Sequence, residues 1–86
     1  MVTNRLRNII FWKIFWITEE YTDINSYLKE LNKVRTFNAE ECKGVGNFIK
    51  RINSPKMSIN IIVIYSGNNV KSVLDKTPIE KIHALF

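Results

Sequence analysis

Two short groups of polar residues carry the side chains that a metal or nucleotide site would need. Glu19-Glu20 and Ser66-Gly67-Asn68 each follow a strongly apolar run of this 86-residue chain. Carboxylates and other hard oxygen donors suit Mg²⁺, which takes one or two carboxylates and keeps several waters. Brought together, the two groups would form a Mg²⁺ or nucleotide site. The simpler interpretation, which we favour, is a solvated turn at Glu19-Glu20 and an ordinary helix cap at Ser66-Gly67-Asn68.

The residues used most often in catalysis are scarce. His83 is the only histidine and lies in an apolar run, with no serine, cysteine or aspartate placed to pair with it in the sequence. Cys42 falls on the apolar stripe of an expected helix, where a buried thiol acts as a small hydrophobic residue. The chain offers no paired nucleophile and base and is too short for two domains. We therefore expect no catalytic residues and no enzyme.

Gly44-Val45-Gly46 and the two tryptophans each suggest a binding function, but a structural role explains both. A dinucleotide fingerprint needs a third glycine and a place directly after a strand, whereas six residues separate Gly44 from Phe37. Glycine weakens a helix, so the helix either begins late or lies close to the sheet. Trp12 and Trp16 share one face of an expected strand, where packing against helices explains them better than base stacking.

The composition is that of one small globular domain. Hydrophobic residues make up 45% of the chain and aromatic residues 12%, so we expect residues 1–86 to form a single domain, with residues 1–8 as an N-terminal extension. The net charge of +5 suits acidic partners, nucleic acid among them. The 13 lysines and arginines are scattered, however, and Lys50-Arg51 is their only adjacent pair. Because nucleic-acid surfaces usually show clustered basic residues, nucleic-acid binding is the less favoured alternative.

The N-terminal apolar segment and the single cysteine bear on location. Residues 8–17 are about half as long as a membrane span, and Lys13 interrupts them. Their β-branched and aromatic residues predict a buried strand instead. The lone Cys42 favours a reducing compartment, so we expect an intracellular, cytoplasmic protein without a membrane span. A mitochondrial location is the alternative, because residues 1–18 are basic and contain no acidic residue.

Apolar runs alternate with amphipathic stretches along the chain. The runs cover residues 14–18, 34–38, 59–65 and 82–86, and the helical stretches cover residues 23–33, 40–52 and 70–75. Strands that alternate with helical patterns predict βαβ units and a parallel sheet. In the second unit, we expect Asn38 to cap the helix, with Glu40 and Glu41 in its first turn.

Two segments have patterns of their own. Thr77-Pro78-Ile79-Glu80 resembles a helix start with proline at its first position, but the rhythm of the units favours Lys81–Phe86 as a fourth strand. The first helix has one apolar face with spacings of three and four, made of Ile24, Tyr27, Leu28, Leu31 and Val34.

The motifs together resemble a degenerate receiver domain of response regulators, within the flavodoxin-like group of folds. The likeness rests on Ile14-Phe15-Trp16-Ile17-Thr18-Glu19-Glu20, on Val34-Arg35-Thr36-Phe37 leading into Ala39-Glu40-Glu41-Cys42, and on residues 61–67. The chain is also similar to receiver-like modules that accompany ADP-ribosyltransferase domains in some eukaryotic proteins. We therefore expect a truncated, three-layer α/β fold (βαβαβαβ) with a parallel sheet of order 2-1-3-4. The ligand crevice of such a sheet, between strands one and three, would join Glu19 and Glu20 to Ser66, Gly67 and Asn68.

What the resemblance implies about activity is mostly negative. Glu19-Glu20 can occupy the place of the acidic pair of receivers, but Tyr65 or Ser66 stands where receivers carry the phosphoryl-accepting aspartate. The threonine or serine after strand four and the lysine after strand five are also absent. The resemblance is thus to a pseudo-receiver, from which phosphotransfer is not inherited.

The number of strands leads to the expected function. A receiver-like fold has five strands and five helices, whereas this chain supplies at most four strands and three helices, which leaves an open sheet edge at residues 81–86. Unpaired strand edges are templates for another chain. We therefore expect a non-catalytic protein–protein interaction module, either a homo-oligomer or a small subunit of a larger assembly, with Ile82, Leu85 and Phe86 at the contact. The Mg²⁺/nucleotide site and nucleic-acid binding are the alternatives.

Overall fold

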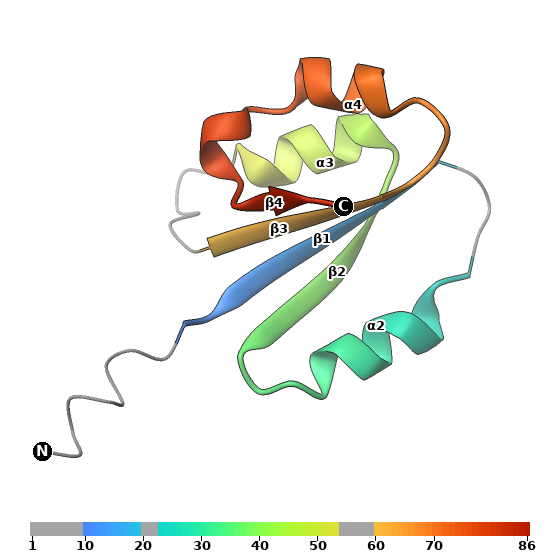
Figure 1. The fold of residues 1–86 in the computed structure, drawn as a ribbon. Coiled ribbons are helices and arrows are strands. Elements are labelled where there is room, and N and C mark those ends of the chain that lie inside the picture. Colours follow the sequence, from blue (N-terminus) through green and yellow to red (C-terminus); the bar gives the residue numbers. More distant parts are fainter. Residues whose placement is uncertain (1–9, 20–22, 54–59) are drawn as a thin grey trace, which may run out of the picture.

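Strands and helices alternate along the chain in the computed structural model, which describes residues 10–19, 23–53 and 60–86 (Figure 1). The N-terminal extension expected at residues 1–8 lies outside these ranges. The elements, in chain order, are β1 (Trp12–Thr18), α2 (Asn25–Asn32), β2 (Phe37–Lys43), α3 (Val45–Ile52), β3 (Asn60–Ser66), α4 (Val70–Lys76), the 3₁₀ turn η1 (Ile79–Lys81) and β4 (Ala84–Leu85).

Four parallel strands form one sheet in the order β2-β1-β3-β4. Trp12 at the start of β1 lies beside Phe37 of β2 and Asn60 of β3. β4 pairs with β3 through Ile62 and Ala84. The predicted α/β class, the parallel sheet and the strand order are therefore confirmed.

One face of the sheet carries the hydrophobic core. Alternate residues of each strand point to this face, and α3 and α4 cover it (Figure 1). Fully burying a large apolar side chain contributes about 1.5–3 kcal/mol, so this side supplies most of the folding energy of a small domain. The buried residues of the core are Phe15, Ile17, Cys42, Phe48, Ile52, Ile61, Val63 and Val73.

The opposite face is covered less completely. α2 lies on this side, next to β2 (Figure 1), and Trp16 of β1 packs against Tyr27 with ring centroids 5.7 Å apart. Of the predicted apolar face of α2, Ile24 is buried, but Tyr27 is 59% and Val34 43% exposed. The predicted helix is present, and its displacement toward one edge of the sheet explains why half of its apolar face stays in water.

The expected boundaries of the second unit are wrong. β2 runs from Phe37 to Lys43, so Asn38, Glu40 and Glu41 lie on a strand and not at the start of a helix. The helix begins late, at Val45, after Gly44 adopts a positive φ of 87° that glycine allows at little cost. Acidic residues are usually depleted in strands, but those of β2 find partners on neighbouring elements.

The C-terminal segment combines both of its sequence patterns. Pro78 precedes the short turn η1, as its helix-start pattern suggested, and a strand follows. That strand is much shorter than the expected Lys81–Phe86, because β4 comprises only Ala84 and Leu85. Among the described residues, no helix has the length and apolar character needed to cross a bilayer.

Candidate functional site

The predicted ligand crevice lies where β1 and β3 end side by side, since Thr18 pairs with Ser66. Glu19 follows directly and is exposed, while Glu20 lies outside the described residues. The hydroxyl of Ser66 accepts a 2.6 Å hydrogen bond from Trp16 Nε1, so one lone pair of this oxygen is already used. Asn68 is exposed.

Gly67 has a steric role at this edge. The Tyr65 side chain folds back toward the turn, where its hydroxyl accepts a hydrogen bond from the Asn69 backbone N–H at 3.1 Å. A Cβ atom on Gly67 would collide with the Tyr65 phenol. The helix cap itself falls one residue beyond the predicted group, because Asn69 Oδ1 accepts from the Ser72 N–H at 3.2 Å.

The structure places four of the five candidate ligands, Glu19, Ser66, Gly67 and Asn68, at or just beyond the carboxyl ends of β1 and β3. The fifth, Glu20, lies outside the described residues. Within residues 10–19, 23–53 and 60–86, no three His, Cys, Asp or Glu side chains come close enough to hold a metal ion. A Mg²⁺ or nucleotide site at Glu19, Ser66, Gly67 and Asn68 stays a prediction.

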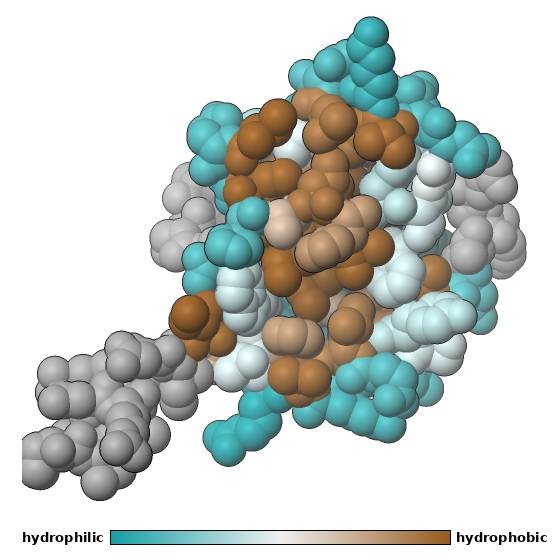
Figure 2. All heavy atoms as spheres, viewed as in Figure 1, coloured by the Kyte–Doolittle hydropathy of each residue, from teal (hydrophilic) through white to brown (hydrophobic). Residues whose placement is uncertain are grey.

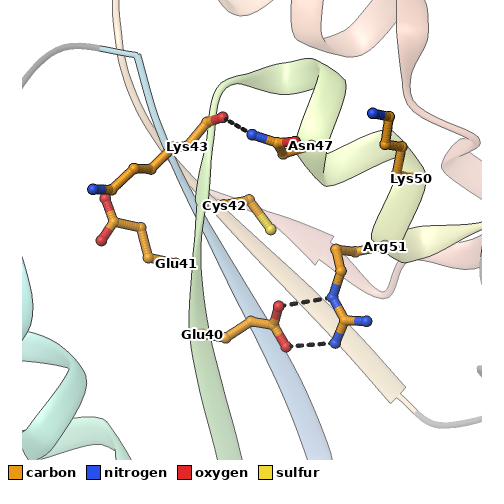
Figure 3. Close-up of a pocket in the computed structure, with 7 residues that line it drawn as sticks. All are labelled: Glu40, Glu41, Cys42, Lys43, Asn47, Lys50 and Arg51. Carbon is orange, nitrogen blue, oxygen red and sulfur yellow. Dashed lines mark hydrogen bonds and ion pairs between the residues drawn. The ribbon is translucent and has the colours of Figure 1, made fainter.

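A shallow groove lies beside the outer strand β2, between β2 and α3 (Figure 3). Its volume is about 430 Å³, and its lining residues are Glu40, Glu41, Cys42, Lys43, Asn47, Lys50 and Arg51. Sequence reasoning missed this groove because it placed Glu40 and Glu41 on the same helix as Arg51. The residues of β2 show no clean alternation of polar and apolar side chains that could have revealed it.

Glu40 is the electrostatic centre of this groove. Its carboxylate accepts two 2.9 Å hydrogen bonds from Arg51 and lies 2.6 Å from the ammonium of the buried Lys13. The hydrogen bonds from Arg51 are the main reason that the pKa of Glu40 falls from 4.5 to about 2, with Lys13 adding to the effect against the opposing influence of burial. Glu40 in turn raises the pKa of Arg51. The three charges join β1, β2 and α3.

Cys42 sits inside the same groove as an inert thiol. Burial is the main cause that raises its pKa to about 11, and the negative charge of Glu40 adds to it. A thiol with so high a pKa is almost wholly protonated at neutral pH and is a poor nucleophile. This environment agrees with the prediction of a small buried hydrophobic residue.

The remaining polar groups of the groove do not converge. Asn47 donates to the Lys43 carbonyl, and Figure 3 shows the amino groups of Lys43 and Lys50 directed to different sides. The polar side chains of this groove are thus either paired with one another or directed apart, and they form no focused set of ligands.

The predicted interface residues lie at the β4 edge with different exposures. Phe86 is 74% exposed, whereas Ile82 and Leu85 are half-buried and pack against the core. The backbone of Phe86 is fixed to β3: its N–H donates to the Val63 carbonyl at 2.8 Å, and its carbonyl accepts from the Tyr65 N–H at 3.0 Å. The exposed ring is thus held on an ordered backbone.

A large hydrophobic area lies on the face shown in Figure 2. It covers the region where Figure 1 has α4 and β4, continues over the strands below β4, and has hydrophilic residues around its margin. His83 lies close by and meets the Trp12 ring edge-on, with centroids 4.9 Å apart. We name as the β4-edge patch the exposed residues Val70, Leu74, Ile79 and Phe86 together with the half-buried Ile82 and Ala84.

Comparisons with known proteins leave the family open. A scan against protein-family models finds no match, and neither a search of curated proteins nor a search of solved structures finds one. The resemblance to receiver domains therefore remains an expectation from the sequence, and a function has to be argued from the geometry of the chain itself.

Proposed function

We propose that this chain is a non-catalytic protein–protein interaction module that binds its partner through the β4 edge. The observation that carries the proposal is the β4-edge patch, with Phe86 at 74% exposure on an ordered backbone at the end of the sheet. Large aromatic rings contribute strongly to binding when a partner buries them. A continuous apolar area with a polar margin is typical of an interaction surface.

The chemistry of the strand itself supports this proposal. Soluble proteins protect exposed sheet edges with lysine, proline or other charged residues. Residues 82–86 contain no lysine, arginine, aspartate, glutamate or proline. In the part of the chain that the structure describes, β4 has β3 on one side and no strand on the other. An edge without protection is suited to pairing.

The exposed residues of α4 enlarge the same surface. Val73 of this helix faces the core, while Val70 and Leu74 remain exposed beside it. An α-helix that packs only against its own sheet would be expected to bury most of its apolar face. The exposed parts of Val70 and Leu74 are therefore apolar surface that a partner could cover.

The mass of the native particle tests the proposal. The chain is tagged, expressed in its organism of origin and purified under native conditions, and light scattering or native mass spectrometry then gives the particle mass. We expect a particle heavier than the 10.1 kDa monomer that dissociates in the Phe86→Asp variant. The matched control is Val34→Asp, an exposed apolar residue beyond the end of α2, which should leave the particle intact. A 10.1 kDa particle that neither change affects would refute the proposal.

A further inference from the structure

We infer that the β2 edge of the sheet binds an extended peptide that carries two consecutive acidic residues. This edge lies at the opposite end of the strand order from β4, so it is a second surface, independent of the proposed contact. The peptide would lie beside residues 41–43 as an added strand, which is a common mode of peptide recognition. Its main chain would bond to β2, and its side chains would meet lysines on both faces of the sheet.

The first half of the β2 edge is already occupied. The Ala39 N–H donates to Asn32 Oδ1 at 2.8 Å, and the Asn32 amide donates to the Ala39 carbonyl at 3.1 Å. The side chain of Asn32 thus forms the two hydrogen bonds that a neighbouring strand would form. Before it, the Phe37 N–H donates to the Val34 carbonyl at 3.0 Å. An added strand therefore has only the part of β2 after Ala39 to pair with.

The second half of the edge carries free main-chain groups. Alternate residues of a strand direct their N–H and C=O groups to the same side, so those of Glu41 and Lys43 point outward like those of Ala39. The Lys43 carbonyl accepts from the Asn47 side chain. Among the described residues, the Glu41 N–H and carbonyl and the Lys43 N–H have no partner. Such groups on an outer strand bind an added strand, and their spacing favours a polypeptide over a nucleic acid.

Lysines flank these free groups on both faces of the sheet. Figure 3 shows Lys43 on one side of β2 and Lys50, from α3, on the other. Both lysines are exposed, and neither forms an ion pair among the described residues. They do not converge on a small ligand, but successive side chains of an extended peptide also point to opposite faces. Two consecutive acidic residues would therefore meet one lysine each.

The carboxylates of this region do not cancel the positive charge. Glu40 is held by Lys13 and Arg51, and Glu41 accepts a 2.6 Å hydrogen bond from the Thr18 hydroxyl. The groove residues and Lys13 together supply four cations and two carboxylates. An excess of cations attracts acidic partners and repels basic ones. The charges that protect β2 from an apolar strand therefore select an acidic one.

Titration with a synthetic peptide tests the inference. The probe is the blocked peptide Thr-Val-Glu-Glu-Val-Thr, added at low salt to the isotope-labelled chain and followed by NMR. At saturation, the amide protons of Glu41 and Lys43 should exchange with solvent at least about tenfold more slowly, and that of Ala39 should be unchanged. A double variant, Lys43→Gln with Lys50→Gln, should bind at least about fivefold more weakly. Lys71→Gln, an exposed lysine of α4, is the matched control and should bind like the wild type.

Several results would overturn the inference: no saturable binding, binding that the double variant does not weaken, or binding that leaves the Glu41 amide proton unprotected. Equal affinity for a peptide with lysines in place of the two glutamates would contradict the role of charge. Binding of a single-stranded oligonucleotide in place of the peptide would count against it in the same way. A loss of affinity in Phe86→Asp would place the peptide at the β4 edge and would also refute a site at β2.

Discussion

The two outer strands of the sheet have opposite chemistry. β2 carries Asn38, Glu40, Glu41 and Lys43, and its Glu40 is held by cations from β1 and α3. β4 carries Ala84 and Leu85, with the exposed Phe86 directly after them. A strand that ends a sheet can be protected by charge or left available for pairing. Among the described residues, the β2 edge carries charged side chains and the β4 edge does not, and this contrast is the reason that we propose β4 as the contact.

Removing the central carboxylate of the protected edge should have the largest effect on stability. Glu40→Gln keeps the size of the side chain but leaves the buried Lys13, which is 7% exposed, without its counter-ion. Hydrogen bonds to charged groups contribute about 1.5–3 kcal/mol, so we expect a loss of about 2 kcal/mol in the free energy of unfolding. Urea unfolding at pH 7 measures it.

Glu30→Gln is the matched control for that change. Glu30 lies 2.7 Å from Lys33, but both side chains are exposed, and an exposed pair of this kind contributes less than about 0.5 kcal/mol. Equal losses in the two variants would contradict the role assigned to the β2 edge.

Acid should remove the same contribution from the wild-type protein. The pKa of Glu40 is about 2 in the folded chain and 4.5 ordinarily, so the folded state binds this proton less readily than the unfolded state. The stabilisation is complete above pH 4.5 and is lost as the pH falls from 4.5 to 2. Unfolding curves of the wild type and Glu40→Gln should therefore converge over this interval. A constant difference between them would show that Glu40 is not the responsible group.

Alanine substitutions of Gly44 and Gly46, where β2 leads into α3, should change the stability less than Glu40→Gln does. The two changes should be opposite in sign. Gly44→Ala forces an L side chain into φ 87° and ψ 153°, backbone angles that essentially only glycine adopts, and should cost at least about 1 kcal/mol. Gly46→Ala adds a Cβ atom that meets nothing within 4 Å inside a helix and should stabilise the protein by about 0.5 kcal/mol. Thermal unfolding distinguishes the two directions, and a loss at both positions would argue against this geometry.

The open edge should contribute least to the stability of the isolated chain. Phe86→Ala removes a mostly exposed ring and should change the free energy of unfolding by less than about 0.5 kcal/mol, as measured in dilute protein. Leu85→Ala removes a half-buried side chain that packs on the core and should cost about 1 kcal/mol or more. If Phe86→Ala were the costlier change in dilute protein, Phe86 would be part of the fold rather than of a contact.

The candidate sites differ in how far the sequence could predict them. Ile82, Leu85 and Phe86 follow from the rhythm of apolar runs, and the structure adds that Phe86 is the exposed member of the three. The Glu40 cluster could not be predicted, because Lys13, Glu40 and Arg51 are distant in the sequence and meet only through the register of β1 with β2 and the docking of α3.

Local hydrophobic pattern determined the fold class and the strand order of this protein. Apolar runs such as residues 61–65 predict strands of a parallel sheet, and short crossovers allow few strand orders. Tertiary structure decided where β2 ends and which apolar residues stay in water. The carboxylate of Glu40 is acceptable on a strand only when cations from other elements neutralise it. The exposure of Phe86 likewise depends on what lies beside β4, and neither condition is encoded in the residues next to it in sequence.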